Sequence, residues 1–252
     1  MKMKHVIGAL AICMVAGTAA AATYTTIIAP PGTEATHLQI MKDIYGGTWV
    51  ASGLDFNNGL GNVSAIRIKD FDGTTPIDIF TGGTGNMDQV WQDGSVTITA
   101  EARFAGYSQK FGYFKGSSGG SYVNLFDVTG SGYNPGGSVT GLDISTAIMP
   151  ETTWRWGRSG TGGDFSSLAD DNPSDIDRMV TYEITGLAGT ETTWLLFWED
   201  LTDMDYNDLV VEVTTVGGGV NPVPEPLTMI SAFLAIGGLG SYIRRRTGRA
   251  AA

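Results

Sequence analysis

The chain has 252 residues, with 26 acidic against 15 basic side chains, and 36 of its residues are glycine. Twenty-five of the acids but only nine of the bases lie between Thr23 and Pro224, so this segment carries a formal charge of −16. Such an excess of acid argues against nucleic acid and anionic lipid surfaces as partners, because both are bound through a basic face. The high glycine content is typical of many short strands joined by tight turns.

The N-terminus has the three parts of an export signal. Lys2 and Lys4 precede an apolar run from Val6 to Gly17, and the small residues of "TAAAA" follow. We therefore predict that residues 1–22 are a cleaved signal peptide, since the apolar run is too short for a membrane span. Cys13 is the one cysteine of the chain and leaves with this segment, so the exported part has no thiolate ligand and no disulfide.

Residues 36–45, "THLQIMKDIY", form the one predicted helix, because Thr36 and Gln39 have capping-box spacing and Gly46-Gly47 follows. After the helix, apolar residues alternate with a period of two, which predicts half-buried strands. The clearest of these segments are residues 63–71, 95–104, 179–186 and 208–213. Glycine-containing turns separate the strands. The pattern predicts an all-β domain over residues 23–216, an antiparallel β-sandwich or jelly roll with one short N-terminal helix.

Two features in the second half of this domain each leave two interpretations open. "WRW" places Trp154 and Trp156 on one face of a strand, where they either pack in the core or stack on sugar rings at a binding surface. "DDNPSDID", residues 170–177, is an acidic loop that either is a solvated turn or faces the acidic segment described next.

Two strand-like runs, residues 195–198 and 209–213, flank the segment "EDLTDMDYND". Its acidic and amide side chains are Glu199, Asp200, Asp203, Asp205, Asn207 and Asp208. Two carboxylates about 4 Å apart repel by about 1 kcal/mol in water and by more inside a protein. With no base close by in the sequence, this crowding predicts a bound cation. Calcium fits an oxygen-only site, whereas zinc and copper prefer nitrogen and sulfur. The alternative is a solvent-exposed turn whose charges water screens, because Asp and Asn are good turn formers.

The segment "WEDLTDMDYNDLVVEV" is similar to the "ED-L … D-x-DYND" pattern that closes a domain family of unknown function in bacterial extracellular proteins. "RMVTYEITG" resembles the segment that precedes that pattern in the family. The resemblance implies a β-sandwich that binds calcium through the six side chains from Glu199 to Asp208 named above. Thr202 stands where members of the family often have glycine, which is a departure in the shape of the loop.

The C-terminus combines a linker, an apolar span and a basic end. Residues 217–226 are rich in glycine and proline, and Leu227 to Ile243 are 17 residues without a charge. At about 1.5 Å per residue this span is roughly 25 Å long as a helix, which is the lower limit for crossing a bilayer. Arg244, Arg245, Arg246 and Arg249 follow, so we predict a transmembrane helix over 227–243 and a cytoplasmic tail over 244–252.

Pro224, Glu225 and Pro226, the apolar span and the arginines resemble the PEP-CTERM sorting signal of Gram-negative bacteria. The resemblance implies that the tripeptide is recognised by an exosortase, a membrane protease-transferase. It also implies that the helix is a temporary anchor in the inner membrane. The protein would then be released to the cell surface or the exopolysaccharide matrix.

These features predict a non-enzymatic, exported surface or exopolysaccharide-matrix protein, with a carbohydrate-binding module for extracellular polysaccharide as the alternative. Beyond the signal peptide, His37 is the one histidine, and no G-x-S-x-G motif accompanies it. A carboxylate pair such as Glu101 and Glu183 could cleave glycosides, but nothing in the sequence distinguishes that pair. We therefore expect no enzymatic activity.

Overall fold

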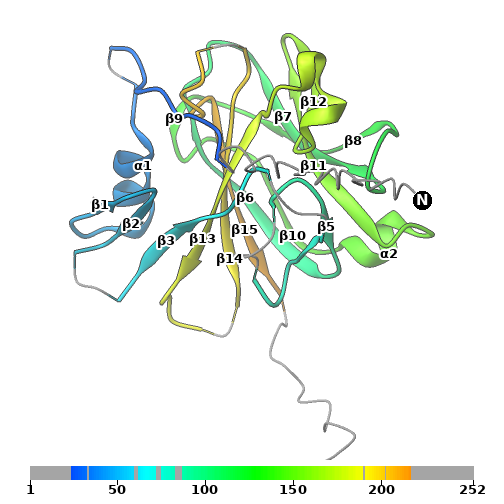
Figure 1. Ribbon diagram of the computed structural model, residues 1–252, viewed down its shortest axis with the longest axis horizontal. Coiled ribbons are helices and arrows are strands. Elements are labelled where there is room, and N and C mark those ends of the chain that lie inside the picture. Colours follow the sequence, from blue (N-terminus) through cyan, green and yellow to red (C-terminus); the bar gives the residue numbers. More distant parts are fainter. Residues whose placement is uncertain are drawn as a thin grey trace, which may run out of the picture.

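Two β-sheets pack face to face in the computed structural model, and a helix covers the outer face of the larger sheet (Figure 1). The structure describes residues 24–216 except 33, 60–61, 72–74, 83–86, 190 and 202. The predicted all-β sandwich is confirmed. The predicted signal peptide (1–22), the linker, Pro224–Pro226, the span 227–243 and the basic tail all lie outside the described residues.

The larger sheet has nine strands, in the order β1 (Val50–Ser52), β2 (Asp55–Asn57), β3 (Ser64–Arg67), β13 (Met179–Thr185), β14 (Thr193–Trp198), β15 (Leu209–Thr215), β6 (Ser95–Arg103) and β10 (Ser138–Asp143), with β9 (Gly132–Tyr133) paired to β6. The smaller sheet has six, in the order β4 (Ile77–Asp78), β5 (Trp91–Gln92), β11 (Thr153–Gly160), β7 (Gln109–Lys115) and β8 (Tyr122–Val128), with β12 (Gly163–Ser166) paired to β11. Strands far apart in sequence are therefore neighbours in both sheets.

Three details differ from the predicted architecture. The pairing of β4 with β5 is parallel, so the sandwich is not purely antiparallel. A second helix, α2 (Ile144–Ile148), follows β10, with the Asp143 side chain accepting a hydrogen bond from the Thr146 backbone. The short 3₁₀ turns η1 (Ala169–Asp171) and η2 (Pro173–Asp175) occupy the second acidic loop. In residues 24–216, as far as they are described, no helix is long and apolar enough to span a membrane.

Helix α1 (His37–Tyr45) begins at the capping box that the sequence predicts. The Thr36 hydroxyl accepts a hydrogen bond from the Gln39 backbone at 3.3 Å, and the Gln39 side chain accepts one from the Thr36 backbone at 2.8 Å. The buried face of α1 packs on the outer face of the larger sheet, and this second core includes Ile40, Met41, Leu195, Phe197 and Tyr206. The helix therefore gives the larger sheet a second buried face.

Strand β14 is the most enclosed element, because all six of its residues are buried. Trp194 and Trp198 face the core between the sheets, whereas Leu195 and Phe197 face the core under α1. A strand covered on both faces has little freedom to move. The acidic segment begins at the residue after this strand, so its first residues are held in place by both cores.

Tryptophan dominates the core between the sheets. Trp154 and Trp156 of β11 are 0% exposed, and their ring centroids lie 5.7 Å apart. Trp91 packs edge-on against Trp156 at 6.0 Å and against Trp194 at 5.0 Å. A ring without exposed surface cannot stack on a sugar. Sugar stacking by Trp154 and Trp156 is therefore wrong in this structure, and core packing is their role.

The first prediction concerns this core. Trp156→Ala should lower the free energy of unfolding by about 3–5 kcal/mol, because it removes a large fully buried side chain and leaves a cavity. The measurement is equilibrium denaturant unfolding. Tyr107→Ala, at a ring that is 47% exposed, should change the stability by no more than about 0.5 kcal/mol. A Trp156→Ala variant as stable as the wild type would contradict the assignment of Trp156 to the core.

Candidate metal centre

The acidic segment is the connection between β14 and β15, which pair antiparallel from Trp198 opposite Leu209. Met204 and Tyr206 have positive φ angles of 60° and 56°, which non-glycine residues adopt only at a cost of about 1–3 kcal/mol each. Tertiary contacts hold this conformation. The Met204 carbonyl accepts a hydrogen bond from Ile28 at 2.8 Å, and the buried Tyr206 hydroxyl donates to the Asp177 carbonyl at 3.0 Å.

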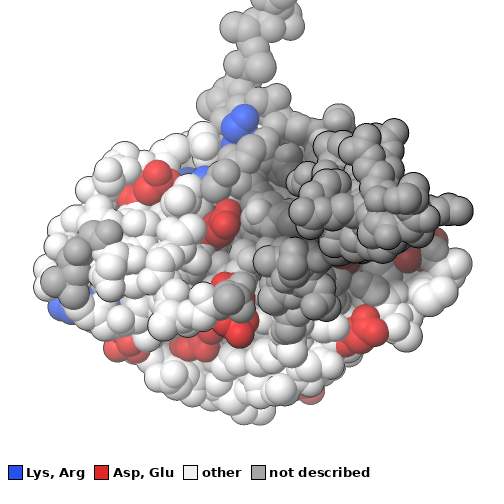
Figure 2. Space-filling view, turned by 90° about the horizontal axis from the view of Figure 1, so that it is seen from below, with Lys and Arg blue, Asp and Glu red and all other residues white. Residues whose placement is uncertain are grey.

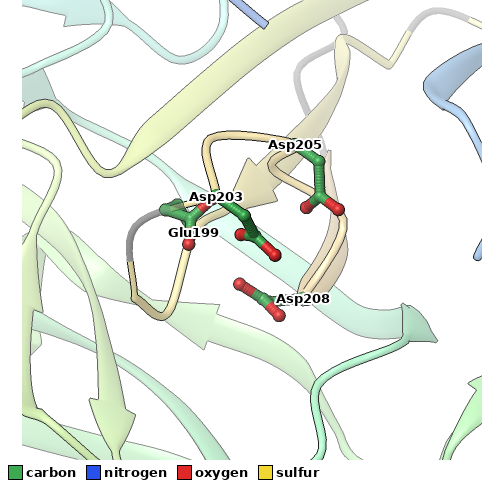
Figure 3. Close-up of side chains that lie close together, drawn as sticks. All are labelled: Glu199, Asp203, Asp205 and Asp208. Atoms are coloured by element: carbon green, nitrogen blue, oxygen red, sulfur yellow. The ribbon is translucent and has the colours of Figure 1, made fainter. Parts of the chain in front are cut away.

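Four carboxylates of this connection come together (Figure 3). Glu199, Asp203, Asp205 and Asp208 each offer one oxygen, and these oxygens all lie within 4.8 Å of one another. Figure 3 shows the Asp203 and Asp205 carboxylates pointing toward Asp208. Glu199 is 1% exposed, Asp205 is 2% exposed and Asp203 is exposed. The structure therefore gathers four of the six side chains that the sequence predicts as ligands.

The other two predicted ligands, Asp200 and Asn207, have structural contacts of their own. The Asp200 carboxylate accepts a hydrogen bond from the Gln109 side chain at 2.9 Å and lies 3.7 Å from the Arg158 guanidinium. The Asn207 side-chain amide donates to the Ala35 carbonyl at 3.0 Å, and its buried Oδ1 has no hydrogen-bond partner. Asp200 thus ties the segment to the smaller sheet, and Asn207 ties it to the residues before α1.

In two of the four acids, the backbone holds one carboxylate oxygen and leaves the other without a partner. Glu199 accepts a hydrogen bond from Leu201 N at 2.8 Å through Oε1, while its buried Oε2 has no hydrogen-bond partner. Asp205 accepts one from Asn207 N at 3.3 Å through Oδ1, while its buried Oδ2 has no partner. Buried polar atoms are rarely left unpaired, so each free oxygen is a candidate ligand atom.

Burial and mutual repulsion oppose the charge on these acids. Burial raises the pKa of Asp208 to about 9, with Asp200 and Glu199 adding to the rise. Burial also raises the pKa of Asp205 to about 7, with repulsion from Asp203 and Glu199. The pKa of Glu199 rises for the same two reasons, burial first. A divalent cation among the oxygens would reverse this balance by stabilising the charged form.

Two arginines that are distant in sequence reach this segment. Arg158 of β11 lies beside Asp200, and Arg178 donates a hydrogen bond to the Leu201 carbonyl. The two guanidinium carbons lie 5.0 and 4.7 Å from the centre of the Phe165 ring. No pattern in the sequence indicated these bases, because pairing between distant strands brings them here. They compensate part of the negative charge, but within the described part of the chain neither forms an ion pair with the four gathered carboxylates.

His37 supports this segment from the outer face of the larger sheet. Its Nε2 lies 3.0 Å from the Asp205 carbonyl, and its Nδ1 lies 3.1 Å from the Tyr182 hydroxyl. Burial lowers the pKa of His37 to about 3, so the ring is neutral at physiological pH. The ring is stacked on Phe197 with the centroids 3.9 Å apart. These contacts make His37 a buried structural side chain.

The second acidic loop only touches the first. The carbonyl of Asp177, at the end of this loop, accepts a hydrogen bond from the Tyr206 hydroxyl. The Asp177 carboxylate instead accepts a hydrogen bond from the Thr25 hydroxyl at 2.6 Å. Asp171, near its start, pairs with Arg155 of β11. The acids of this loop therefore do not join the four carboxylates.

The carboxylate pair Glu101 and Glu183 does not form, because two strands, β14 and β15, lie between β6 and β13. Glu101 instead neighbours Glu212 in a cavity of about 450 Å³ beside α1. Glu212 accepts a hydrogen bond from the Tyr45 hydroxyl at 2.6 Å. Burial, with repulsion from Glu212, raises the pKa of Glu101 to about 7.

Comparisons with known proteins place the chain in no family. No protein-family model and no curated protein matches it. Three solved lectins align with about half of this chain. A fucoside-bound lectin of Chromobacterium violaceum is 18% identical over 52% of this chain and 97% of its own, with a TM-score of 0.35.

The other two lectins give similar values. A mannose-binding lectin of Ralstonia solanacearum is 20% identical over 52% of this chain and 97% of its own, with a TM-score of 0.34. The C-terminal domain of a Burkholderia cenocepacia lectin is 16% identical over 51% of this chain and 96% of its own, with a TM-score of 0.33. Likenesses this low support no argument about the function of the chain.

The second prediction tests the electrostatics beside α1. The raised pKa of Glu101 means that folding favours its protonated form. Ionisation of Glu101 therefore lowers the free energy of unfolding increasingly as pH rises from about 4.5 through 7. Glu101→Gln cannot lose a proton. The Tm of this variant, relative to the wild type, should therefore be higher at pH 8 than at pH 5.

Thermal unfolding at the two pH values measures this difference, and Glu151→Gln, at an exposed position, makes the same change of charge as the control. If the Tm difference between Glu101→Gln and the wild type is equal at pH 5 and pH 8, the pKa of Glu101 is not raised by its surroundings.

Proposed function

We propose that this chain is an exported, non-enzymatic surface or exopolysaccharide-matrix protein whose β-sandwich is stabilised by calcium. Glu199, Asp203, Asp205 and Asp208 would hold the ion. The observation that carries the proposal is their convergence to within 4.8 Å, with buried oxygens of Glu199 and Asp205 that have no hydrogen-bond partner.

The chemistry of the donors favours calcium over other metals. The cluster offers carboxylate oxygens only, and calcium takes six to eight oxygen ligands in flexible geometry. The single histidine beyond residue 22 is already engaged through both ring nitrogens, so the cluster offers no nitrogen of the kind zinc and copper prefer. Three of the four acids, Glu199, Asp205 and Asp208, are no more than 9% exposed, which makes bulk water a poor means of screening their charges.

A cation at this place would act as a cross-link. The acidic segment contacts the residues before α1 through Asn207 and Ile28, and the smaller sheet through Asp200. An exported domain without cysteine cannot use a disulfide for this purpose. Calcium binding would stabilise the fold by about 2.7 kcal/mol when the free ion exceeds its Kd a hundredfold.

The sorting half of the proposal is supported by the resemblance of the C-terminus to the PEP-CTERM signal. Exosortase and the inner membrane are the partners it implies, with Pro224, Glu225 and Pro226 as the processing motif. Extracellular polysaccharide stays a proposed partner, because the sorting signal implies release to the exopolysaccharide matrix. The buried Trp154 and Trp156 are no longer candidates for contacting it. Acidic side chains predominate on the face shown in Figure 2, which agrees with the expectation that nucleic acid is not a partner.

The third prediction tests the metal. Calcium at a hundredfold excess over its Kd should raise the Tm by roughly 5–11 °C relative to EDTA, for a domain of this size. Asp205→Asn keeps the shape of the side chain but removes a ligand charge, so it should abolish most of this rise. In EDTA at pH 8, the same substitution should leave the Tm equal or higher, because it relieves repulsion among the carboxylates.

Differential scanning calorimetry distinguishes these outcomes. Asp170→Asn, at an exposed acid of the second loop, should leave the calcium effect unchanged. Melting curves that coincide in calcium and EDTA, or an Asp205→Asn variant that loses the same stability in both, would contradict a metal role.

The fourth prediction tests sorting. Glu225→Ala combined with replacement of Arg244, Arg245 and Arg246 should leave the precursor unprocessed in the inner membrane of a host that makes an exosortase. Cell fractionation and immunoblotting measure processing and location, with Glu151→Ala in the folded domain as the control. If the variant with the Glu225 and arginine substitutions is processed like the wild type, the tail is an ordinary membrane anchor.

A further inference from the structure

A cavity of about 420 Å³ lies between α1 and β9. Its volume falls within the range of about 300–1,000 Å³ that small-molecule sites occupy. The residues that line it are Ala35, Gln39, Lys42, Asp43, Phe104 and Tyr133. None of the four carboxylates is among these residues, so the cavity is distinct from the candidate metal centre.

The α1 side of the cavity is polar. Gln39, Lys42 and Asp43 are spaced by three and four residues, which places them on one face of the helix, and all three side chains are exposed. In the part of the chain that the structure describes, the Gln39 amide nitrogen, the Lys42 ammonium and the Asp43 carboxylate make no hydrogen bond. This wall therefore offers both donors and an acceptor to a ligand.

The opposite wall is aromatic. The Tyr133 side chain is 38% exposed, and its ring meets the Phe104 ring edge-on, with the centroids 5.5 Å apart and the planes at 87°. The pairing of β9 with β6 holds Tyr133, and the Asn134 backbone donates to the Glu101 carbonyl at 2.8 Å. Burial, and then the charge of Asp43, raises the pKa of Tyr133, so its hydroxyl stays a hydrogen-bond donor at neutral pH.

Both walls are hydrogen-bonded to the acidic segment between β14 and β15. The Asn207 side chain donates to the Ala35 carbonyl at 3.0 Å. The Ala105 backbone, next to Phe104, donates to the Asp208 carbonyl at 3.3 Å. The segment that gathers the four carboxylates therefore also fixes the two walls relative to each other.

We propose that this cavity binds one pyranose unit of a neutral extracellular polysaccharide, with the Tyr133 ring against the apolar face of the sugar. A pyranose has a C–H face that packs on an aromatic ring and a rim of hydroxyls that donate and accept hydrogen bonds. Asp43 accepts from these hydroxyls, and Gln39 and Lys42 donate to them. This inference rests on the proposed release of the protein to an exopolysaccharide matrix.

The chemistry of the walls argues against other occupants. The charges of Lys42 and Asp43 cancel, whereas the segment from Thr23 to Pro224 carries −16 and repels a polyanion. A wholly apolar ligand would leave the polar side chains of α1 without partners. A stable protein partner buries about 800 Å² on each side around several anchors, but Tyr133 is the one exposed ring among the lining residues.

Native affinity electrophoresis of the full chain in mild detergent, with calcium present, tests the inference. The gels contain dextran, galactomannan or hydroxyethyl cellulose, and carboxymethyl dextran serves as the acidic counterpart of dextran. At least one neutral polymer should retard the wild type. Tyr133→Ala should weaken this binding by about tenfold or more, because it removes the stacking ring. Tyr133→Phe keeps the ring and should bind within about threefold of the wild type.

Two matched controls and a second variant complete the test. Tyr107→Ala, at a 47% exposed ring outside the cavity, should bind like the wild type. Asp43→Ala removes the acceptor and should weaken binding by about fivefold or more, whereas Asp170→Ala, at another exposed acid, should not. All these positions are on the surface, so the Tm of each variant should stay within about 3 °C of the wild type.

Retardation by none of the neutral polymers, retardation by carboxymethyl dextran alone, or equal retardation of wild type and Tyr133→Ala would overturn the inference. The failures of the two proposals are distinguishable. A chain that calcium stabilises and that is processed at its C-terminus, but that no neutral polymer retards, loses this inference alone. Retardation that depends on Tyr133 supports the inference even where the melting curves in calcium and EDTA coincide, in which case the calcium site alone is lost.

Discussion

Carboxylates that a fold removes from water must be protonated or paired with positive charge, and this domain buries two groups of them side by side. The first lies between β14 and β15, and the second is Asp70, Asp88 and Asp177, which are no more than 4% exposed. Tyr206 lies between the groups: it belongs to the segment that carries Glu199, Asp205 and Asp208, and its hydroxyl donates to the carbonyl of Asp177 in the other group. Arg158, Arg178 and Arg67 compensate part of the charge. The remaining deficit is the constraint on which the proposed calcium site depends.

The surrounding architecture holds these acids in place rather than letting them separate. β14 is buried on both faces, so the segment starts from a rigid strand. The residues before α1 hold one side of it through Ile28 and Ala35, and Gln109 of the smaller sheet holds the other through Asp200. A loop free to open would relieve the repulsion by moving its carboxylates into water. This one cannot do so without breaking its contacts to the residues before α1 and to the smaller sheet, which supports the proposed cation.

Local patterns predicted the elements well. The capping box at Thr36 set the start of α1, the strict alternation of residues 95–103 set β6, and the apolar runs on either side of the acidic segment became β14 and β15. The crowding of acids in this segment also predicted that Asp203 and Asp205 would share a site, and their carboxylates do come together. These features depend on residues close together in sequence, which a pattern can report.

What could not be predicted depends on pairing between distant strands. The approach of Arg158 to Asp200 and the neighbourhood of Glu101 and Glu212 follow from sheet order. The burial of Trp154 and Trp156 follows from which face of β11 meets the larger sheet. The group of Asp70, Asp88 and Asp177 joins three separate loops, so no spacing in the sequence could indicate it.

A crystal structure grown with millimolar calcium, with anomalous scattering data, tests the metal most directly. The expected result is a single strong peak with oxygens of Glu199, Asp203, Asp205 and Asp208 at about 2.3–2.6 Å from it. A map that shows only water at this position would contradict the central claim that a cation balances these buried charges.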